Sequence, residues 1–333
     1  MSSVYDLICD PEHCFLIAEI GSNHNGDFDT ALKLMDIARE AGADAVKFQS
    51  FLADHLVKAD SPDYEMLKRI ELPQSWYPRL KTAAAERGML FFSTATNSIT
   101  LKWLADNNVE VYKLASPNLT HIPLIRELAA LGKPVIVSTG MAGMQQIDEA
   151  IRAFTDAGNT RLAILHCTSE YPARPETLNL RAIETLAATF PFPVGFSDHS
   201  LDGGTAVAAV ALGARVVEKH LTLERTGPGP DHHYALQPDE FIRMGKSIRI
   251  VEKSLGDGRK QPTEIELQKA ALYWRSLHAA RDFPAGHALT AADISIVRPN
   301  DGLHPRHLVD VVGLTLRAPM AAGVPIQWTH FKS

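Results

Sequence analysis

Residues 14–50, CFLIAEIGSNHNGDFDTALKLMDIAREAGADAVKFQS, contain a short apolar run, a polar loop, an amphipathic stretch and a second apolar run. In the amphipathic stretch, Leu32, Met35 and Ala38 recur at the spacing of one helix face, and Gly42 follows as a residue suited to end a helix. The two apolar runs have the length and composition of buried strands. The segment therefore predicts a strand–helix–strand unit, the repeat from which parallel sheets are built.

The same alternation continues as far as residue 255 and predicts eight strand–helix units. The expected strands are residues 14–20, 44–49, 89–95, 111–116, 134–140, 162–168, 193–199 and 215–223, and the last expected helix is 238–255. Eight such units over this length are typical of a (β/α)8 TIM barrel, an α/β fold. An open, doubly wound sheet is the structural alternative. No G-x-G-x-x-G motif follows the first expected strand to support a dinucleotide-binding half of that kind.

The pattern changes after residue 257. The segment GDGRKQPTEIELQ (256–268) is polar and rich in breakers, and it predicts a linker over residues 258–275. From residue 276 to 333, short apolar pieces alternate with turn-forming segments such as FPAGHALT and MAAGVPI, which predict a small β-rich domain. We therefore expect a TIM-barrel catalytic domain at residues 1–257. The small domain is near the lower limit for a self-sufficient core and is expected to lean on another surface.

Composition excludes several classes of protein. Hydrophobic residues make up 45% of the 333 residues and charged residues 22%, which excludes a disordered or collagen-like chain. The formal net charge of −6 argues against nucleic acid as a partner. The three cysteines form no C-x-x-C pair, and their odd number favours reduced thiols in the cytosol. Without a basic, apolar signal segment or a membrane-length apolar run, the sequence predicts a cytoplasmic protein.

The expected strands end in polar and charged residues. Because side chains alternate along a strand, Lys47 shares a face with Gln49, and Glu218 shares a face with His220. Active sites of TIM barrels lie at the carboxyl ends of the strands. Burying unpaired charges inside a barrel costs roughly several kcal/mol each, so this cluster predicts a functional site.

Two histidines, His199 and His220, end the seventh and eighth expected strands. Neighbouring strand ends can place two imidazoles within reach of one cation. Two histidines do not identify the metal, so Mn²⁺, Mg²⁺, Zn²⁺ and Fe²⁺ remain open. The alternative for each histidine is a simple core position.

Ammonium and hydroxyl groups also gather near the expected strand ends, where they could hold a phosphate or a carboxylate. They belong to Lys47, Lys113, Ser116, Ser138 and Ser197. An anionic substrate is therefore predicted despite the negative net charge. Either lysine could instead form a Schiff base.

Three further residues have less specific surroundings. Glu19 could act as an acid or base toward water, or could form an ion pair at the bottom of the barrel. Asp231 lies in RTGPGPDHH (225–233), which is either a lid over the site or a plain surface loop. Cys167 is expected to pack in its strand without a catalytic role.

At these positions the sequence closely resembles the sialic acid synthase family, whose bacterial members condense phosphoenolpyruvate with an N-acetylated hexosamine. The resemblance runs through IAEIGSNHNGD, ADAVKFQS, FFSTATN, YKLASPN, KPVIVSTGMA, LHCTSEYPA, VGFSDHS, GARVVEKHLTL, GPGPDHH and RPNDGLHP. It implies a TIM barrel joined to an antifreeze-like SAF domain, with a β-clip fold. It also implies a domain-swapped homodimer in which the SAF domain covers the barrel mouth of the partner.

The resemblance assigns roles residue by residue. It implies phosphoenolpyruvate binding by Lys47, Thr94, Lys113, Ser116, Ser138, Ser169 and Ser197. It implies amino-sugar binding by Gln49, Asn118, Tyr171, Asp231 and Arg298, the last reaching the sugar in the other subunit. The implied catalytic residues are Glu19, which handles the water, and His199 and His220, which hold a divalent metal. That metal is Mn²⁺ in the first place, with Mg²⁺ or Co²⁺ as alternatives.

The substrate that the resemblance implies is an N-acetylmannosamine-type sugar, which gives a nine-carbon 2-keto-3-deoxy sugar acid and phosphate by metal-assisted, aldol-like addition with C–O cleavage. Asn118 stands where neuraminate synthases usually carry an acid; a neutral amide can donate as well as accept, so the pattern of hydroxyl or N-acyl groups that it recognises can differ. The segment SIVRPNDGLHP also resembles the pseudaminic acid synthases. A pseudaminic or legionaminic acid synthase using a 2,4-diacetamido-trideoxy hexose is an alternative. A Schiff-base lysine aldolase, a metal hydrolase and a non-catalytic glycan-binding or ice-binding protein are alternatives from other classes.

Overall fold

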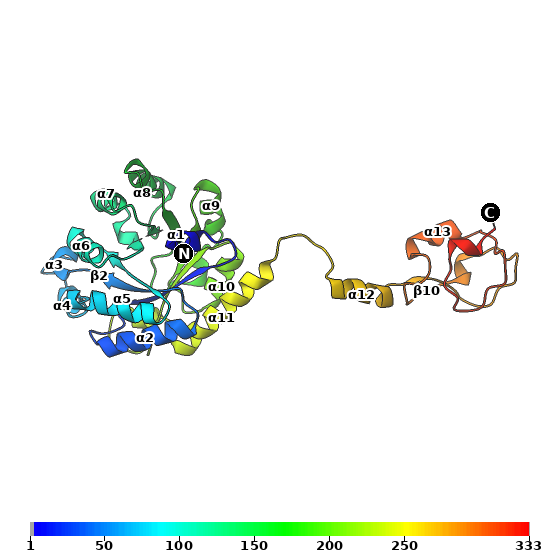
Figure 1. Ribbon diagram of the computed structural model, residues 1–333, viewed down its shortest axis with the longest axis horizontal. Coiled ribbons are helices and arrows are strands. Elements are labelled where there is room, and N and C mark those ends of the chain that lie inside the picture. The colour runs from blue at the N-terminus through cyan, green and yellow to red at the C-terminus, as the bar shows by residue number, and fades with distance from the viewer. Residues whose placement is uncertain (1–2, 333) are drawn as a thin grey trace. The chain divides into compact units, whose positions relative to one another are not determined.

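A computed structural model describes residues 3–332, and the strands of its larger unit form one closed parallel barrel (Figure 1). The strands are β1 Phe15–Gly21, β2 Ala45–Ser50, β3 Leu90–Ala95, β4 Tyr112–Leu114, β5 Val135–Ser138, β6 Leu162–Cys167, β7 Val194–Asp198 and β8 Val216–His220. Each strand pairs with the next in chain order, and β1 also pairs with β8, which closes the barrel. The predicted TIM barrel is confirmed, and the open sheet is wrong.

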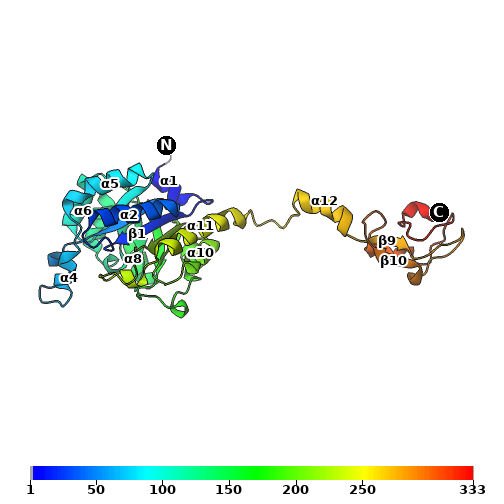
Figure 2. The same ribbon diagram turned by 90° about the horizontal axis from the view of Figure 1, so that it is seen from below.

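Helices surround the barrel (Figures 1 and 2). They are α1 Val4–Cys9, α2 Phe28–Glu40, α3 Ala53–Leu56, α4 Tyr64–Arg69, α5 Tyr77–Glu86, α6 Ser98–Asp106, α7 Ile122–Ala130, α8 Met144–Asp156, α9 Ala182–Thr189, α10 Gly204–Ala211 and α11 Pro238–Leu255. The helix expected from the opening segment is α2. Asp27 caps its start, where the carboxylate accepts hydrogen bonds from two backbone N–H groups of the first turn, and the helix buries Leu34, Met35 and Ala38.

Along each strand, the side chains that face the inside of the barrel change from apolar at the amino end to polar at the carboxyl end. At the amino ends, Phe15 and Ile17 of β1 pack with Val216 of β8 and with Ile8 of α1 in one apolar cluster. The next inward position on β1 is Glu19, which is paired in register with both Lys47 and His220. Every second residue of a strand faces inward. The same strands therefore supply both the apolar cluster at the amino end of the barrel and the polar residues at its carboxyl end.

Gly195 is the inward residue of β7 below Ser197. A Cβ atom at this position would lie 2.3 Å from the carbonyl oxygen of Val216 and 2.7 Å from Cδ2 of Leu165. The absence of a side chain therefore lets β6, β7 and β8 close together beneath the strand ends. The polar residues above this point depend on that close approach.

We predict that Gly195→Ala destabilises the protein by about 1–3 kcal/mol, because the new methyl group overpacks the barrel against backbone atoms. Urea unfolding followed by circular dichroism measures the change. Gly143→Ala is the matched control, since a Cβ there would meet only the flexible Gln146 amide, at 3.3 Å. Equal stability of the two variants would contradict the packing argument.

A second compact unit begins at Asp257. Its strands β9 Ser276–Ala279 and β10 Ile294–Val297 pair antiparallel, and one isolated bridge joins His278 of β9 to Pro325. Leu277, Phe283, Leu316 and Ile326 belong to its own apolar core. This small β-rich domain also contains α13 Leu308–Val311. Residues 258–275, expected as a linker, include the helix α12 Glu264–Tyr273, which buries none of its residues within the chain.

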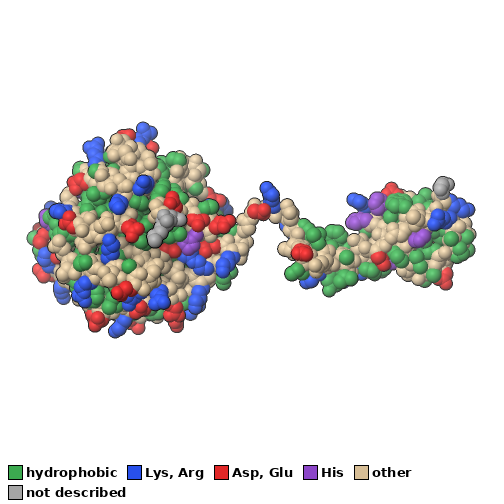
Figure 3. All heavy atoms as spheres, viewed as in Figure 1, with side chains coloured by type: hydrophobic (Ala, Val, Ile, Leu, Met, Phe, Trp, Pro, Cys, Tyr) green, Lys and Arg blue, Asp and Glu red, His purple; other side chains and the backbone are tan. Residues whose placement is uncertain are grey.

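The surface of the barrel unit carries charges of both signs. On the face shown in Figure 3, lysine and arginine side chains are interspersed with aspartate and glutamate, and no single-sign field covers it. Within residues 3–332, no helix has both the length and the apolar composition needed to cross a bilayer.

Candidate active site

A cavity of about 410 Å³ opens at the carboxyl ends of the barrel strands. Most of the residues predicted from the sequence line it: Glu19, Lys47, Gln49, Thr94, Lys113, Ser116, Asn118, Ser138, Tyr171, Ser197, His199, His220 and Asp231. Of the other two predicted residues, Ser169 lies just behind the wall and Arg298 lies in the second unit. The strand ends thus bring together residues from across about 200 positions of sequence.

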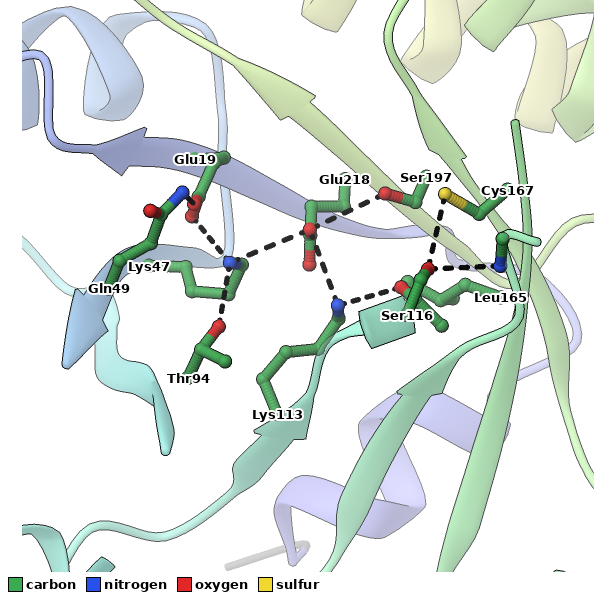
Figure 4. A network of polar contacts seen from close by, with 12 residues as sticks. Glu19, Lys47, Gln49, Thr94, Lys113, Ser116, Leu165, Cys167, Ser197 and Glu218 are labelled. Atoms are coloured by element: carbon green, nitrogen blue, oxygen red, sulfur yellow. Dashed lines mark hydrogen bonds and ion pairs between the residues drawn. The ribbon is translucent and has the colours of Figure 1, made fainter. Parts of the chain in front are cut away.

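Two lysines lie at the centre of the polar network shown in Figure 4. Lys47 Nζ is 2.8 Å from Glu19 Oε2 and donates a hydrogen bond to Thr94 Oγ1 at 3.2 Å. Lys113 Nζ donates to Ser138 Oγ at 2.7 Å. Both ammonium groups are buried, with residue exposures of 3% and 2%. Neither lysine is the solvated surface residue that its type usually is.

Glu218 links the two lysines. Its Oε1 atom lies 3.6 Å from Lys47 Nζ and 3.5 Å from Lys113 Nζ, and it accepts a hydrogen bond from Ser197 at 3.5 Å. The sequence placed Glu218 on the same face as His220 but gave it no role, because its contacts lie on other strands. Although burial opposes ionisation, Lys113 and Lys47 hold the pKa of Glu218 below its usual value.

The pKa of Glu19 is shifted in the opposite direction to that of Glu218. Complete burial, together with the charge of Glu218, raises its pKa to about 7, although Lys47 and Gln49 oppose the rise. Near neutral pH the two lysines therefore face one ionised carboxylate and one carboxyl group close to its titration midpoint. Two buried ammonium groups with hydroxyl groups beside them can bind an anionic ligand.

Some oxygens of this network have unused hydrogen-bonding capacity. Glu19 Oε2 contacts Lys47 without hydrogen-bond geometry, and Glu218 Oε2 has no partner. Buried polar atoms are normally satisfied, so unpaired atoms beside a cavity indicate a bound molecule or ordered water. Both carboxylates can accept protons or hydrogen bonds from a ligand.

His199 and His220 lie side by side, with ring centroids 5.5 Å apart. The Nδ1 atom of His199 is 2.9 Å from the carbonyl oxygen of Thr168, so this nitrogen carries the proton and Nε2 keeps its lone pair. The Nδ1 atom of His220 is buried without a partner. Burial, reinforced by His199 and Lys47, holds the pKa of His220 well below its usual value. A neutral imidazole is the form that binds metals.

Asp231 lies at the edge of the cavity beside His220. It accepts hydrogen bonds from Tyr234 Oη at 2.7 Å, Ser22 Oγ at 3.2 Å and Gln49 Nε2 at 3.3 Å. Gln49 also donates to Glu19 Oε1, at 2.9 Å. The loop 225–233 therefore contributes a carboxylate to the cavity wall, and the plain surface loop is wrong for this residue. Tyr234 was not predicted, since no motif marked it.

The interpretation of Cys167 as a packing residue is incomplete. Its Sγ atom lines the cavity, 3.8 Å from His199 Nδ1 and 3.6 Å from Ser116 Oγ. Burial alone would raise the pKa of the Cys167 thiol, but the contact with His199 holds that pKa below its usual value. Sequence neighbours could not show this because both partners lie just after other strands, β4 and β7.

Gly140 has no side chain, which lets the hydroxyl groups of Ser116 and Ser169 lie close to its backbone. A Cβ atom there would lie 2.2 Å from Ser169 Oγ and 2.9 Å from Ser116 Oγ. Ser116 Oγ also accepts a hydrogen bond from the Gly140 N–H at 2.9 Å. The buried Ser169 hydroxyl has no partner.

Comparison with known proteins agrees with this geometry. Residues 34–260 match the NeuB family, and residues 275–332 match the SAF domain. The chain belongs to the NeuB family. The predicted family, the SAF domain and the enzyme class, a condensing transferase, are thereby confirmed, and NeuB-family relatives make the chain a nonulosonic acid synthase.

Relatives of this NeuB-family chain differ in their sugars. It is 38% identical to N,N'-diacetyllegionaminic acid synthase of Legionella pneumophila, over 96% of this chain and 95% of that protein. It is 33% identical to a pseudaminic acid synthase of Campylobacter jejuni, over 96% of both chains. The crystal structure of N-acetylneuraminic acid synthetase from Leptospira borgpetersenii superimposes with a TM-score of 0.74 at 33% identity, covering 77% of this chain and 90% of that one.

If Glu19 acts as a base, activity rises with pH as its carboxyl group ionises around its pKa of about 7. We predict that the ratio of wild-type to Glu19→Gln kcat/KM rises about tenfold per pH unit below that value and levels off above it, at about 10²–10⁴. The ratio removes the titration of the substrates. Glu86→Gln, an exposed position on α5, should match the wild type at every pH. A ratio that does not vary with pH would exclude Glu19 as the base.

Proposed function

We propose that this NeuB-family enzyme condenses phosphoenolpyruvate with an N-acetylmannosamine-type amino sugar, giving a nine-carbon 2-keto-3-deoxy sugar acid and phosphate. The observation that carries the proposal is the pair of buried ammonium groups of Lys47 and Lys113 in the cavity wall, next to the side-by-side rings of His199 and His220. The relatives named as synthases support the same reaction class.

The lysines bind the anionic substrate. We assign the carboxylate and phosphate of phosphoenolpyruvate to Lys47, Lys113 and the surrounding hydroxyl groups. These hydroxyls belong to Thr94, Ser116, Ser138, Ser169 and Ser197. The lysine and hydroxyl donors lie on successive strand ends, so they can hold the enol in one orientation while the second substrate enters from the mouth.

His199 and His220 would hold a divalent metal. His220 has an unpartnered Nδ1 and a pKa held low, and His199 turns Nδ1 to the Thr168 carbonyl so that Nε2 is left for a ligand; both fit this role, and Mn²⁺ is the first candidate, before Mg²⁺ and Co²⁺. Among residues 3–332, no group of three or more His, Cys, Asp or Glu side chains could hold a cation, so further ligands would come from substrate and water. When bound, the metal supplies Lewis-acid polarisation of the sugar aldehyde.

In the reaction, C3 of phosphoenolpyruvate forms a bond to the aldehyde carbon of the open-chain sugar, whose oxygen takes up a proton and becomes a hydroxyl group. Water adds at C2, and Glu19 takes a proton from it. Phosphate leaves with cleavage of the C2–O bond, and the ketone forms. Lys47 contacts Glu19 and keeps the Glu19 carboxylate beside the positive charge that develops at C2 of phosphoenolpyruvate.

The sugar would contact Gln49, Asn118, Tyr171 and Asp231 at the mouth. Asn118 donates to the carbonyl of Ala95 at 3.4 Å and presents no charge to the cavity. This neutral group, together with Leu56 and Leu67 in the wall, favours a second candidate, a 2,4-diacetamido-trideoxy hexose with fewer hydroxyl groups. The product would then be a legionaminic or pseudaminic acid.

The test is phosphate release from phosphoenolpyruvate and Mn²⁺ with a panel of amino sugars. We predict release with N-acetylmannosamine or a 2,4-diacetamido-trideoxy hexose, none without a sugar, and loss of activity with a chelator and in His220→Ala. The sugar with the highest kcat/KM identifies the substrate.

Two outcomes would contradict the proposal. Phosphate release with none of the sugars would exclude the condensation. A lysine adduct trapped by borohydride in the presence of chelator would instead favour the Schiff-base aldolase.

We also propose that the chain acts as a domain-swapped homodimer, in which Arg298 reaches the sugar bound by the partner. Apolar side chains gather along α12 and just after it, where Ile265, Leu267, Leu272 and Trp274 are all more than half exposed (Figure 3). Exposed apolar surface of this kind is usually covered in an assembly.

A mixture of two defective chains tests the exchange. His220→Ala impairs the barrel, and Arg298→Ala impairs the second unit. In a swapped dimer, one of the two sites in the mixed dimer has an intact barrel and an intact Arg298, so co-refolding the two variants should restore part of the activity. Light scattering checks that both variants are dimers. Activity no higher than the average of the two separate variants would contradict the swap.

A further inference from the structure

The outward faces of β7 and β8 carry a second polar cluster, separate from the cavity. Lys219 Nζ lies 2.9 Å from Asp198 Oδ2, and both side chains are completely buried. Neither residue lines the cavity, because side chains alternate: Ser197 and His199 face inward around Asp198, and Glu218 and His220 face inward around Lys219. The ion pair therefore lies directly behind the two histidines.

The pair is fully hydrogen-bonded. Lys219 Nζ also donates to the carbonyl of Ser200 at 2.5 Å and to that of Asp202 at 3.3 Å. Asp198 accepts from the Ser200 N–H at 2.8 Å and from Thr205 Oγ1 at 2.7 Å. The bonds of Lys219 lead from the end of β8 to the end of β7 and to the loop after it, and those of Asp198 lead to the same loop and to Thr205 in α10. This network is a clamp between two strand ends.

The clamp lies where the strand ladder stops. Asp198 and Lys219 form the last paired position of β7 and β8, and His199 is one residue beyond it. His199 is therefore held between Asp198 and Ser200, both members of the network. The ring of His220 has no hydrogen bond at Nδ1 to fix it, so its position depends on its backbone and on the packing of Tyr234, with ring centroids 4.8 Å apart.

A purely structural role explains this arrangement poorly. Buried ion pairs add little net stability compared with apolar residues of the same shape, because desolvation offsets their attraction. Their better-supported use is to specify one geometry. Here the geometry specified is that of the two residues next to the pair in sequence.

We propose that the Asp198–Lys219 ion pair is a positioning device that fixes the separation of His199 and His220 and thereby sets the affinity of the site for a divalent metal. The inference rests on the proposed metal site. The pair touches neither the cavity nor the cation, and acts through the backbone of its neighbours.

The test uses the full-length protein and the double variant D198N/K219M. The single change Lys219→Met would leave a buried carboxylate unpaired and could prevent folding. The double variant removes both charges, and the amide oxygen introduced at position 198 can still accept from the Ser200 N–H. Mn²⁺ binding is followed by electron paramagnetic resonance of the free ion, which does not depend on turnover, and Tm is measured on the metal-free proteins.

We expect the Kd for Mn²⁺ to rise about tenfold or more in D198N/K219M, as for other residues that support metal ligands. We expect the Tm of the metal-free variant to stay close to that of the wild type and excess Mn²⁺ to restore turnover. The matched control is D44N/R249M, which removes another charged contact, 3.0 Å long, at the amino end of the barrel. It should leave the Kd for Mn²⁺ unchanged even if it lowers Tm.

Two results would overturn the inference. A Kd for Mn²⁺ within twofold of the wild type in folded D198N/K219M would show that the pair has no positioning role, while the metal site itself would stand. If wild-type protein bound no Mn²⁺, the proposed metal site would fail and the inference would fail with it. Measuring the wild type first distinguishes the two cases.

Discussion

The charges buried at the carboxyl end of the barrel determine how the rest of the site is arranged. Lys47, Lys113, Glu19 and Glu218 are almost inaccessible to water, so each must find its partners inside the barrel. Glu218 lies between the two lysines, and Glu19 contacts Lys47, although burial raises the pKa of Glu19. An anionic substrate that contacts the two ammonium groups would extend this network, and a ligand that binds only the folded state stabilises that state.

Sequence periodicity was sufficient to predict the barrel because each of its units repeats the same strand–helix pattern. Strand ends were less accurate: the last strand was expected to reach residue 223 but ends at His220. The strand ends there because Leu221 and Thr222 lie beside Leu236, in the segment before α11, and no longer beside β7. Helix α12 was missed because the segment before it is polar and rich in breakers, and because its apolar residues are not buried within the chain.

The face shared by Lys47 and Gln49, or by Glu218 and His220, could be predicted because alternation along a strand is a local property. The partners of Glu218 and Cys167 could not, because they depend on the register between strands that are distant in sequence. The contact of Cys167 with His199 arises from the paired register of β6 and β7. Tyr234 entered the site through a loop whose path no periodicity describes.

The strand ends of β7 and β8 show how one short segment can serve two purposes. In Ser197–Asp198–His199 and in Glu218–Lys219–His220, the first and third residues face the cavity. The middle residue faces away from it and forms the clamp. An apolar middle residue would pack as well but would not bind the loop after β7 through specific hydrogen bonds. Geometry at a metal site tolerates errors of only a few tenths of an ångström. In the proposed metal site, a buried ion pair at the last register position would provide that restraint without placing another charge in the cavity.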